Sequence, residues 1–81
     1  MATVLFLCSA SAGSPFVFNL PAATGSANVG IIKKVDANAQ NVNVVPHGTD
    51  TIDGVNATVN ITLQNGFIQI ADAASGQWQT F

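Results

Sequence analysis

Apolar and polar residues alternate with a period of two along much of this chain. In residues 58–63, Val59, Ile61 and Leu63 fall on one side of an extended backbone, and Thr and Asn residues fall on the other. Successive side chains of a strand point to opposite faces, so this pattern is typical of a strand with one face in a core. The same reasoning over the neighbouring segments predicts these core residues: Val42, Val44, Val59, Ile61, Leu63, Ile68 and Ile70.

Gly, Pro, Asn and Asp residues separate the apolar runs at spacings of about 8 to 12 residues, and no run has a helical period. The sequence therefore predicts one all-β domain over residues 1–81 with seven to eight short antiparallel strands. A small sandwich, a jelly-roll-like barrel and a strand array intertwined about a threefold axis all fit this pattern. The expected strands are residues 3–8, 16–20, 29–36, 41–46, 50–53, 58–63, 67–71 and 77–81.

Two local features refine this prediction. Asn65-Gly66 is a strong signal for a two-residue hairpin turn, so residues 58–63 and 67–71 are expected to pair directly. Lys33 and Lys34 are expected where the third strand reaches solvent. Because neighbouring residues of a strand point to opposite faces, the two lysines should not converge on an anion.

The composition is poor in charge for a chain of 81 residues. Charged residues make up 7% of the chain and hydrophobic residues 48%, whereas soluble proteins average about 25% charged residues. A domain this small buries only about 60% of its unfolded surface. A mixed charged surface normally keeps small domains apart, so we expect partner subunits to cover much of this one and to form a homo-oligomer.

Charge and hydropathy also exclude some partners. With two cationic side chains and a net charge of -2, the chain lacks the basic surface that binds nucleic acid. The apolar residues 4–8 form too short a run for a secretory signal or a membrane span, so the sequence predicts a strand there and no membrane partner.

Few side chains could do chemistry, since the chain has one Cys, one His, four Asp and no Glu. Cys8 is interpreted as a small buried apolar residue and His47 as an exposed loop residue, although copies of His47 could meet a metal ion on a threefold axis. Asp50 and Asp53 are interpreted as turn caps that bond nearby backbone N–H groups, not as a calcium loop. We expect no enzyme activity, no cofactor and no metal site.

Several short motifs follow one another in a recognisable order. They are Leu20-Pro21-Ala22-Ala23, then Ile32-Lys33-Lys34 with Asp36, then Asn41-Val42 with Val44, Pro46 and Gly48, then Asp50-Thr51-Ile52-Asp53-Gly54, then Thr62-Leu63, and finally Gly76 with Trp78. This series resembles a β-rich unit of bacteriophage tail-fibre, spike and decoration proteins. The resemblance implies a location in the virion, a homotrimer, and contacts with phage coat or tail proteins.

Two functions follow from this resemblance. The first is a capsid decoration or cement protein, which is favoured because here the unit makes up the whole chain. The second is a tail-fibre or spike component that binds a host receptor or surface glycan, with a sugar stacked on an exposed aromatic ring such as Trp78 or Phe67. The residues expected at interfaces are Val4, Leu5, Phe6, Leu7, Phe67, Trp78 and Phe81.

Overall fold

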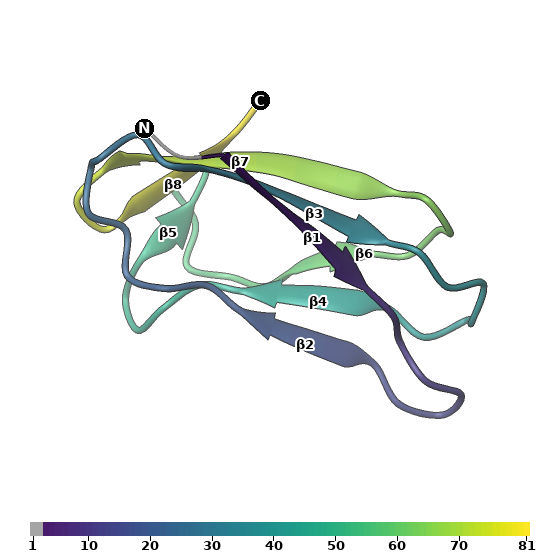
Figure 1. The fold of residues 1–81 in the computed structure, drawn as a ribbon. Helices are drawn as coiled ribbons and strands as arrows, with labels where there is room; N and C mark the ends of the chain where they lie inside the picture. The colour runs from purple at the N-terminus through teal and green to yellow at the C-terminus, as the bar shows by residue number, and fades with distance from the viewer. Residues whose placement is uncertain (1–2) are drawn as a thin grey trace.

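Strands form where the sequence alternates or is rich in β-branched residues, and turns form at the Gly, Pro, Asn and Asp clusters. The computed structural model describes residues 3–81 (Figure 1). No helix in this range is long and apolar enough to span a membrane. Within it the strands are β1 (Thr3–Cys8), β2 (Phe16–Asn19), β3 (Val29–Lys34), β4 (Val42–Val45), β5 (Thr51–Ile52), β6 (Val59–Ile61), β7 (Phe67–Ala74) and β8 (Gln77–Thr80). The all-β prediction is confirmed.

The chain passes from one sheet to the other at almost every turn. One sheet has the strand order β1-β3-β7-β8-β5 and the other has the order β2-β4-β6, and the two lie one above the other (Figure 1). Up to β7, odd-numbered strands belong to the first sheet and even-numbered strands to the second. Among the strands of residues 3–81, only β7 and β8 are consecutive in one sheet, so most strands pair with a partner that is distant in the sequence.

The expectation that all strands are antiparallel is wrong. β1 and β3, β2 and β4, and β5 and β8 are parallel pairs, whereas the β3–β7, β4–β6 and β7–β8 pairs are antiparallel. Parallel neighbours need a long crossover, which is usually a helix. Here β2 lies in the crossover from β1 to β3, and β3 lies in the crossover from β2 to β4. Both sheets keep free edges, so the barrel alternative is also wrong for the single chain.

The core lies between the two sheets. Its buried side chains include Val42 and Val44 of β4, Ile61 of β6 and Ile70 of β7, which confirms those predictions. Val59 and Ile68 are partly buried and pack against this cluster. Leu63 is 74% exposed, so its predicted burial is wrong.

Leu63 is exposed because β6 ends at Ile61 and the chain then turns toward the other sheet. Gly66 N–H donates to the Leu63 carbonyl (2.9 Å), and Asn65 adopts a positive φ of 64°. The turn also pairs with the end of β3, since Asn65 N–H donates to the Lys34 carbonyl (2.7 Å) and Lys34 N–H donates to the Gly66 carbonyl (2.9 Å). The predicted hairpin is therefore wrong: β6 pairs with β4, and β7 pairs with β3.

The difference between Ile61 and Leu63 gives a direct test of the register of β6. Ile61→Ala removes methyl groups from the core and should lower the free energy of unfolding by about 2–5 kcal/mol. Leu63→Ala is the matched control and should change it by no more than about 0.5 kcal/mol. Urea unfolding followed by tryptophan fluorescence measures both values, and equal losses in the two variants would contradict the register.

Candidate functional site

The two lysines of β3 differ in their surroundings, because Lys34 lies on the buried face and is 0% exposed. Its Nζ donates to Asp36 Oδ2 (2.5 Å) and to the carbonyls of Asp36 (3.1 Å) and Asn38 (3.0 Å). The prediction that Lys34 reaches solvent is thus wrong, since a carboxylate and two carbonyls replace the water around its ammonium group. Asp36 Oδ1 also accepts a hydrogen bond from Ala10 N–H (2.8 Å).

Asp36 stays ionised in acid because of this pairing. The hydrogen bond from Lys34 is the largest of the effects that lower the pKa of Asp36 from 3.8 to about 2, and the N–H groups of Ala10 and Asn38 add to it. The carboxylate therefore ties the end of β3 to the loop after β1. This contact has a structural role.

Asp72 of β7 is also buried and bonded. It accepts hydrogen bonds from Asn28 N–H (2.6 Å), Thr24 Oγ1 (3.0 Å) and Thr24 N–H (3.4 Å). Desolvation by burial raises its pKa, but the bonds from Asn28 and Thr24 outweigh it, so the pKa of Asp72 is below its ordinary value. Asp72 thereby holds the loop between β2 and β3 against the five-stranded sheet.

The sequence predicts that Asp50 and Asp53 accept hydrogen bonds from nearby backbone N–H groups. This prediction is wrong, because their hydrogen-bond partners are distant in the sequence. Ala23 N–H donates to Asp50 Oδ2 (2.9 Å), 27 residues away. Thr80 donates to Asp53 from its N–H (2.8 Å) and from its hydroxyl, also 27 residues away. These bonds from Thr80 lower the pKa of Asp53. Within residues 3–81, no group of three or more His, Cys, Asp or Glu side chains could hold a metal ion.

The remaining reactive side chains are those of Cys8 and His47. Cys8, at the end of β1, is buried as predicted, and burial raises the pKa of its thiol. A raised pKa disfavours the thiolate, which is the reactive form. His47 lies exposed in the loop after β4, also as predicted.

The surface feature that stands out is an open edge formed by β1 and β2. β1 is the outermost strand of one sheet and β2 of the other, and the rings of Phe6 and Phe18 meet between them, with centroids 4.7 Å apart. The large apolar side chains along this edge are 37–63% exposed. They are Val4, Leu5, Phe6, Leu7, Phe16 and Val17.

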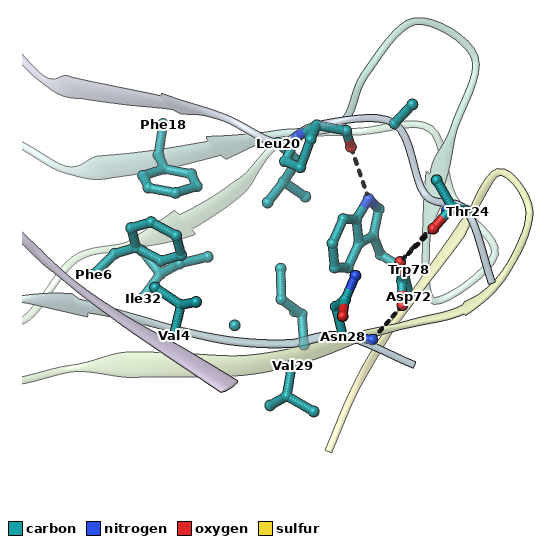
Figure 2. A pocket seen from close by; sticks show the side chains of 14 residues that line it. Val4, Phe6, Phe18, Leu20, Thr24, Asn28, Val29, Ile32, Asp72 and Trp78 are labelled. Atoms are coloured by element: carbon teal, nitrogen blue, oxygen red, sulfur yellow. Dashed lines mark hydrogen bonds between the residues drawn. The ribbon is translucent and has the colours of Figure 1, made fainter. Parts of the chain in front are cut away.

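A groove of about 420 Å³ opens between the two sheets along this edge. Val4, Phe6 and Phe18 line one part of it, and Trp78 and Asp72 lie at the other end (Figure 2). The indole N–H of Trp78 donates to the Pro21 carbonyl (3.3 Å) and is thus satisfied inside the protein. The groove is therefore mostly apolar, and the carboxylate at its end is already bonded to Thr24 and Asn28.

The residues expected at interfaces fall into three places. Val4, Leu5, Phe6 and Leu7 lie together on β1 and are exposed. Phe67 is exposed on the outer face of the same sheet, in one cross-strand row with Leu7 and Lys33. Phe81 is exposed just after β8. Trp78 is only 5% exposed, so its ring cannot offer the stacking surface for a glycan that the sequence suggested.

Sequence reasoning did not place Phe16 and Val17 at this edge. The alternation of residues 16–20 puts Phe16 and Phe18 on one face of the strand, but β2 has no neighbour on one side, and Phe16 stays 37% exposed. Pro21 did indicate that this strand either ends there or lies at an edge, since proline cannot donate to a sheet ladder.

The bonds of Asp36, Asp53 and Asp72 predict how stability depends on pH. Each folded-state pKa lies below its ordinary value of 3.8, so these groups stabilise the fold above that pH, and the stabilisation is lost as the pH falls through the folded-state pKa, which for Asp36 is about 2. Asp36→Asn should be less stable than the natural chain at neutral pH and should lose less on acidification. Urea unfolding at pH 7, 4 and 2 measures this, and an equally steep loss in both proteins would contradict the role of Asp36.

Comparisons with known proteins identify no relative of this chain. No family model matches it, and neither the curated proteins nor the solved structures include a significant match.

Proposed function

We propose that this protein is a non-enzymatic structural component of a bacteriophage virion, working as a capsid decoration or cement protein through contacts with copies of itself and with phage coat proteins. The observation that carries the proposal is the open apolar edge of β1 and β2. Monomeric proteins rarely expose large contiguous apolar patches, and such patches mark interaction sites. β1 exposes apolar side chains on both of its faces, with Val4 and Phe6 toward the groove and Leu5 and Leu7 away from it, which suits a partner bound along this strand.

The distribution of charge supports the same conclusion. Lys34 and Asp72 are buried, and Lys33, Asp36 and Asp50 are half-buried. Only Asp53 of the charged side chains is exposed, and it is bonded to Thr80. Charged residues are depleted at the centres of protein–protein interfaces, so this surface carries little that a partner would have to desolvate.

The motifs that carry the resemblance to phage proteins also contact one another. Pro21 accepts the hydrogen bond of Trp78, and Ala23 donates to Asp50. Lys34 pairs with Asp36 within its own motif. Motifs with these mutual roles behave as one structural unit, which supports the use of the resemblance for function.

A decoration protein would stabilise a shell by mass action, because it binds the assembled coat and not the free coat protein. A stable contact of this kind buries on the order of 800 Å² per partner. The resemblance further implies a homotrimer, and each of its three copies would contribute to the contact with the coat.

Particles that lack this protein test the proposal. We expect depleted particles to lose DNA or break at a lower temperature than intact ones, and to break earlier as the salt concentration is lowered. Purified protein added back should restore their tolerance. Leu7→Lys places a charge on the edge and should restore less, whereas Leu63→Lys, on an exposed turn elsewhere, should restore as much as the natural protein.

The opposite result would overturn the decoration role. If depleted particles are as robust as intact ones but fail to attach to host cells, the protein acts in receptor or glycan binding. Phe67 is then the exposed aromatic ring to replace first, because Trp78 is buried.

A further inference from the structure

The outer side of β1 carries unpaired backbone groups. β1 pairs with β3 in a parallel register that runs from Thr3–Val29 to Cys8–Lys34, and the Cys8 carbonyl accepts a hydrogen bond from Val35 N–H (2.9 Å). In a parallel ladder every second residue directs both its N–H and its carbonyl toward the neighbouring strand. Cys8, Phe6 and Val4 therefore face β3.

The alternate residues, Thr3, Leu5 and Leu7, direct their N–H and carbonyl groups to the opposite side. Within residues 3–81, no strand of the chain lies on that side, because β1 ends the sheet order. Proteins usually protect such an edge with Lys, Pro, a bulge or a covering loop. β1 has no Lys or Pro, and its register with β3 runs without a break over six residues.

We infer that β1 pairs with β1 of a second copy, antiparallel and across a twofold axis at Leu5. In this register Leu5 lies opposite Leu5 of the second copy, and Thr3 lies opposite Leu7 of the second copy. The residues whose N–H and carbonyl groups point away from β3 then lie opposite each other as hydrogen-bonded pairs. This gives roughly six interchain hydrogen bonds, two for each of three pairs. The two five-stranded sheets join into one sheet that runs through both copies.

The side chains fit this arrangement. On the outer face Leu5 meets Leu5 and Leu7 meets Thr3, while on the inner face Phe6 meets Val4. Antiparallel apolar pairs of this kind stabilise a sheet by contact across strands. The Phe6–Phe18 contact places β2 beside β1, so β2 of each copy lies next to the same interface.

The area available favours a second copy as the occupant. Aromatic side chains such as Phe6 offer about 150–250 Å² each, and pairing also covers the aliphatic side chains and backbone of β1. Two copies together then bury on the order of 1,000 Å², which is near the lower limit for a specific interface. A twofold contact also closes on itself and leaves no unpaired copy of this edge.

The pairing of β1 goes beyond the proposed virion role, because it concerns how two copies of this protein bind each other. This twofold contact alone gives a dimer. Together with the threefold contact implied by the resemblance, it gives a hexamer. Either way the number of copies is even. A partner of another kind, such as a strand of a coat protein, would leave the isolated protein as a monomer or a trimer.

Cysteine cross-linking tests the register. Leu5→Cys places two thiols opposite each other on strands whose Cα atoms are about 5.5 Å apart, within the range of a disulfide. Leu7→Cys is the matched control, because its two introduced thiols would lie four residues apart along the strands, about 13 Å. Under mild oxidation Leu5→Cys should form a covalent dimer at least about tenfold faster than Leu7→Cys, as paired thiols have a millimolar effective concentration.

The natural chain gives the background for this experiment, since its single thiol, on Cys8, is buried. Equal rates for the two variants, or faster cross-linking of Leu7→Cys, would overturn the proposed register.

Native mass spectrometry of the isolated protein tests the pairing itself. The natural chain should give dimers or hexamers, and a monomer or a trimer would overturn the inference. Leu5→Pro removes an outward-directed N–H without removing a bond to β3, and proline is tolerated on edge strands. It should weaken the pairing by roughly 100-fold while the circular dichroism spectrum stays unchanged.

Leu5→Lys keeps the backbone groups but places like charges against each other at the axis, and it should also dissociate the pair. Leu63→Lys adds the same charge on an exposed turn and should leave the pair intact. If both Leu5 variants fold and still pair, the interface lies elsewhere and the inference fails. Neither result depends on whether the protein stabilises a capsid, so this inference and the proposed function can fail separately.

Discussion

Hydrogen bonds from distant backbone N–H groups to the four aspartates hold the loops of this fold in place. Each carboxylate accepts a bond from a residue at least 26 positions away in the sequence. The chain changes sheet at almost every loop, so these loops receive few ladder hydrogen bonds. Charged acceptors form stronger bonds than neutral ones, so each aspartate fixes a loop or strand end that has few ladder bonds of its own.

This use of the charged residues explains the character of the surface. A chain with six charged side chains that commits most of them to internal bonds has few left for contact with water. The pairing of buried Lys34 with half-buried Asp36, and the bonds of buried Asp72, thus stabilise the fold, and at the same time they leave the outside apolar or neutral. The open edge of β1 and β2 is the part of the molecule where this shortage of charge is most evident.

The positions of the strands could be predicted from the sequence, but their partners could not. A short run of apolar, β-branched and aromatic residues located β1 at Thr3–Cys8, and alternation placed Val42 and Val44 in the core, because both patterns are local properties of the sequence. Parallel pairing, the exposed Leu63 and the change of sheet at Asn65-Gly66 depend on which strand lies alongside, and a local pattern does not contain that information. Lys34 was misplaced for a related reason, since its burial requires Asp36 and Asn38 to fold back around its ammonium group.

The alternation of the chain between two sheets also constrains the order in which this protein can fold. Among the described strands, only β7 and β8 can form an antiparallel pair from neighbouring segments, and pairing of distant segments is slow because long loops must close first. β3 pairs with β7, and β5 pairs with β8, so the five-stranded sheet is incomplete without this pair. During synthesis the ribosome makes β7 and β8 after the other six strands. The larger sheet can therefore be completed only late, and until β7 and β8 have emerged the pair of β1 and β3 lacks its neighbour on the β3 side.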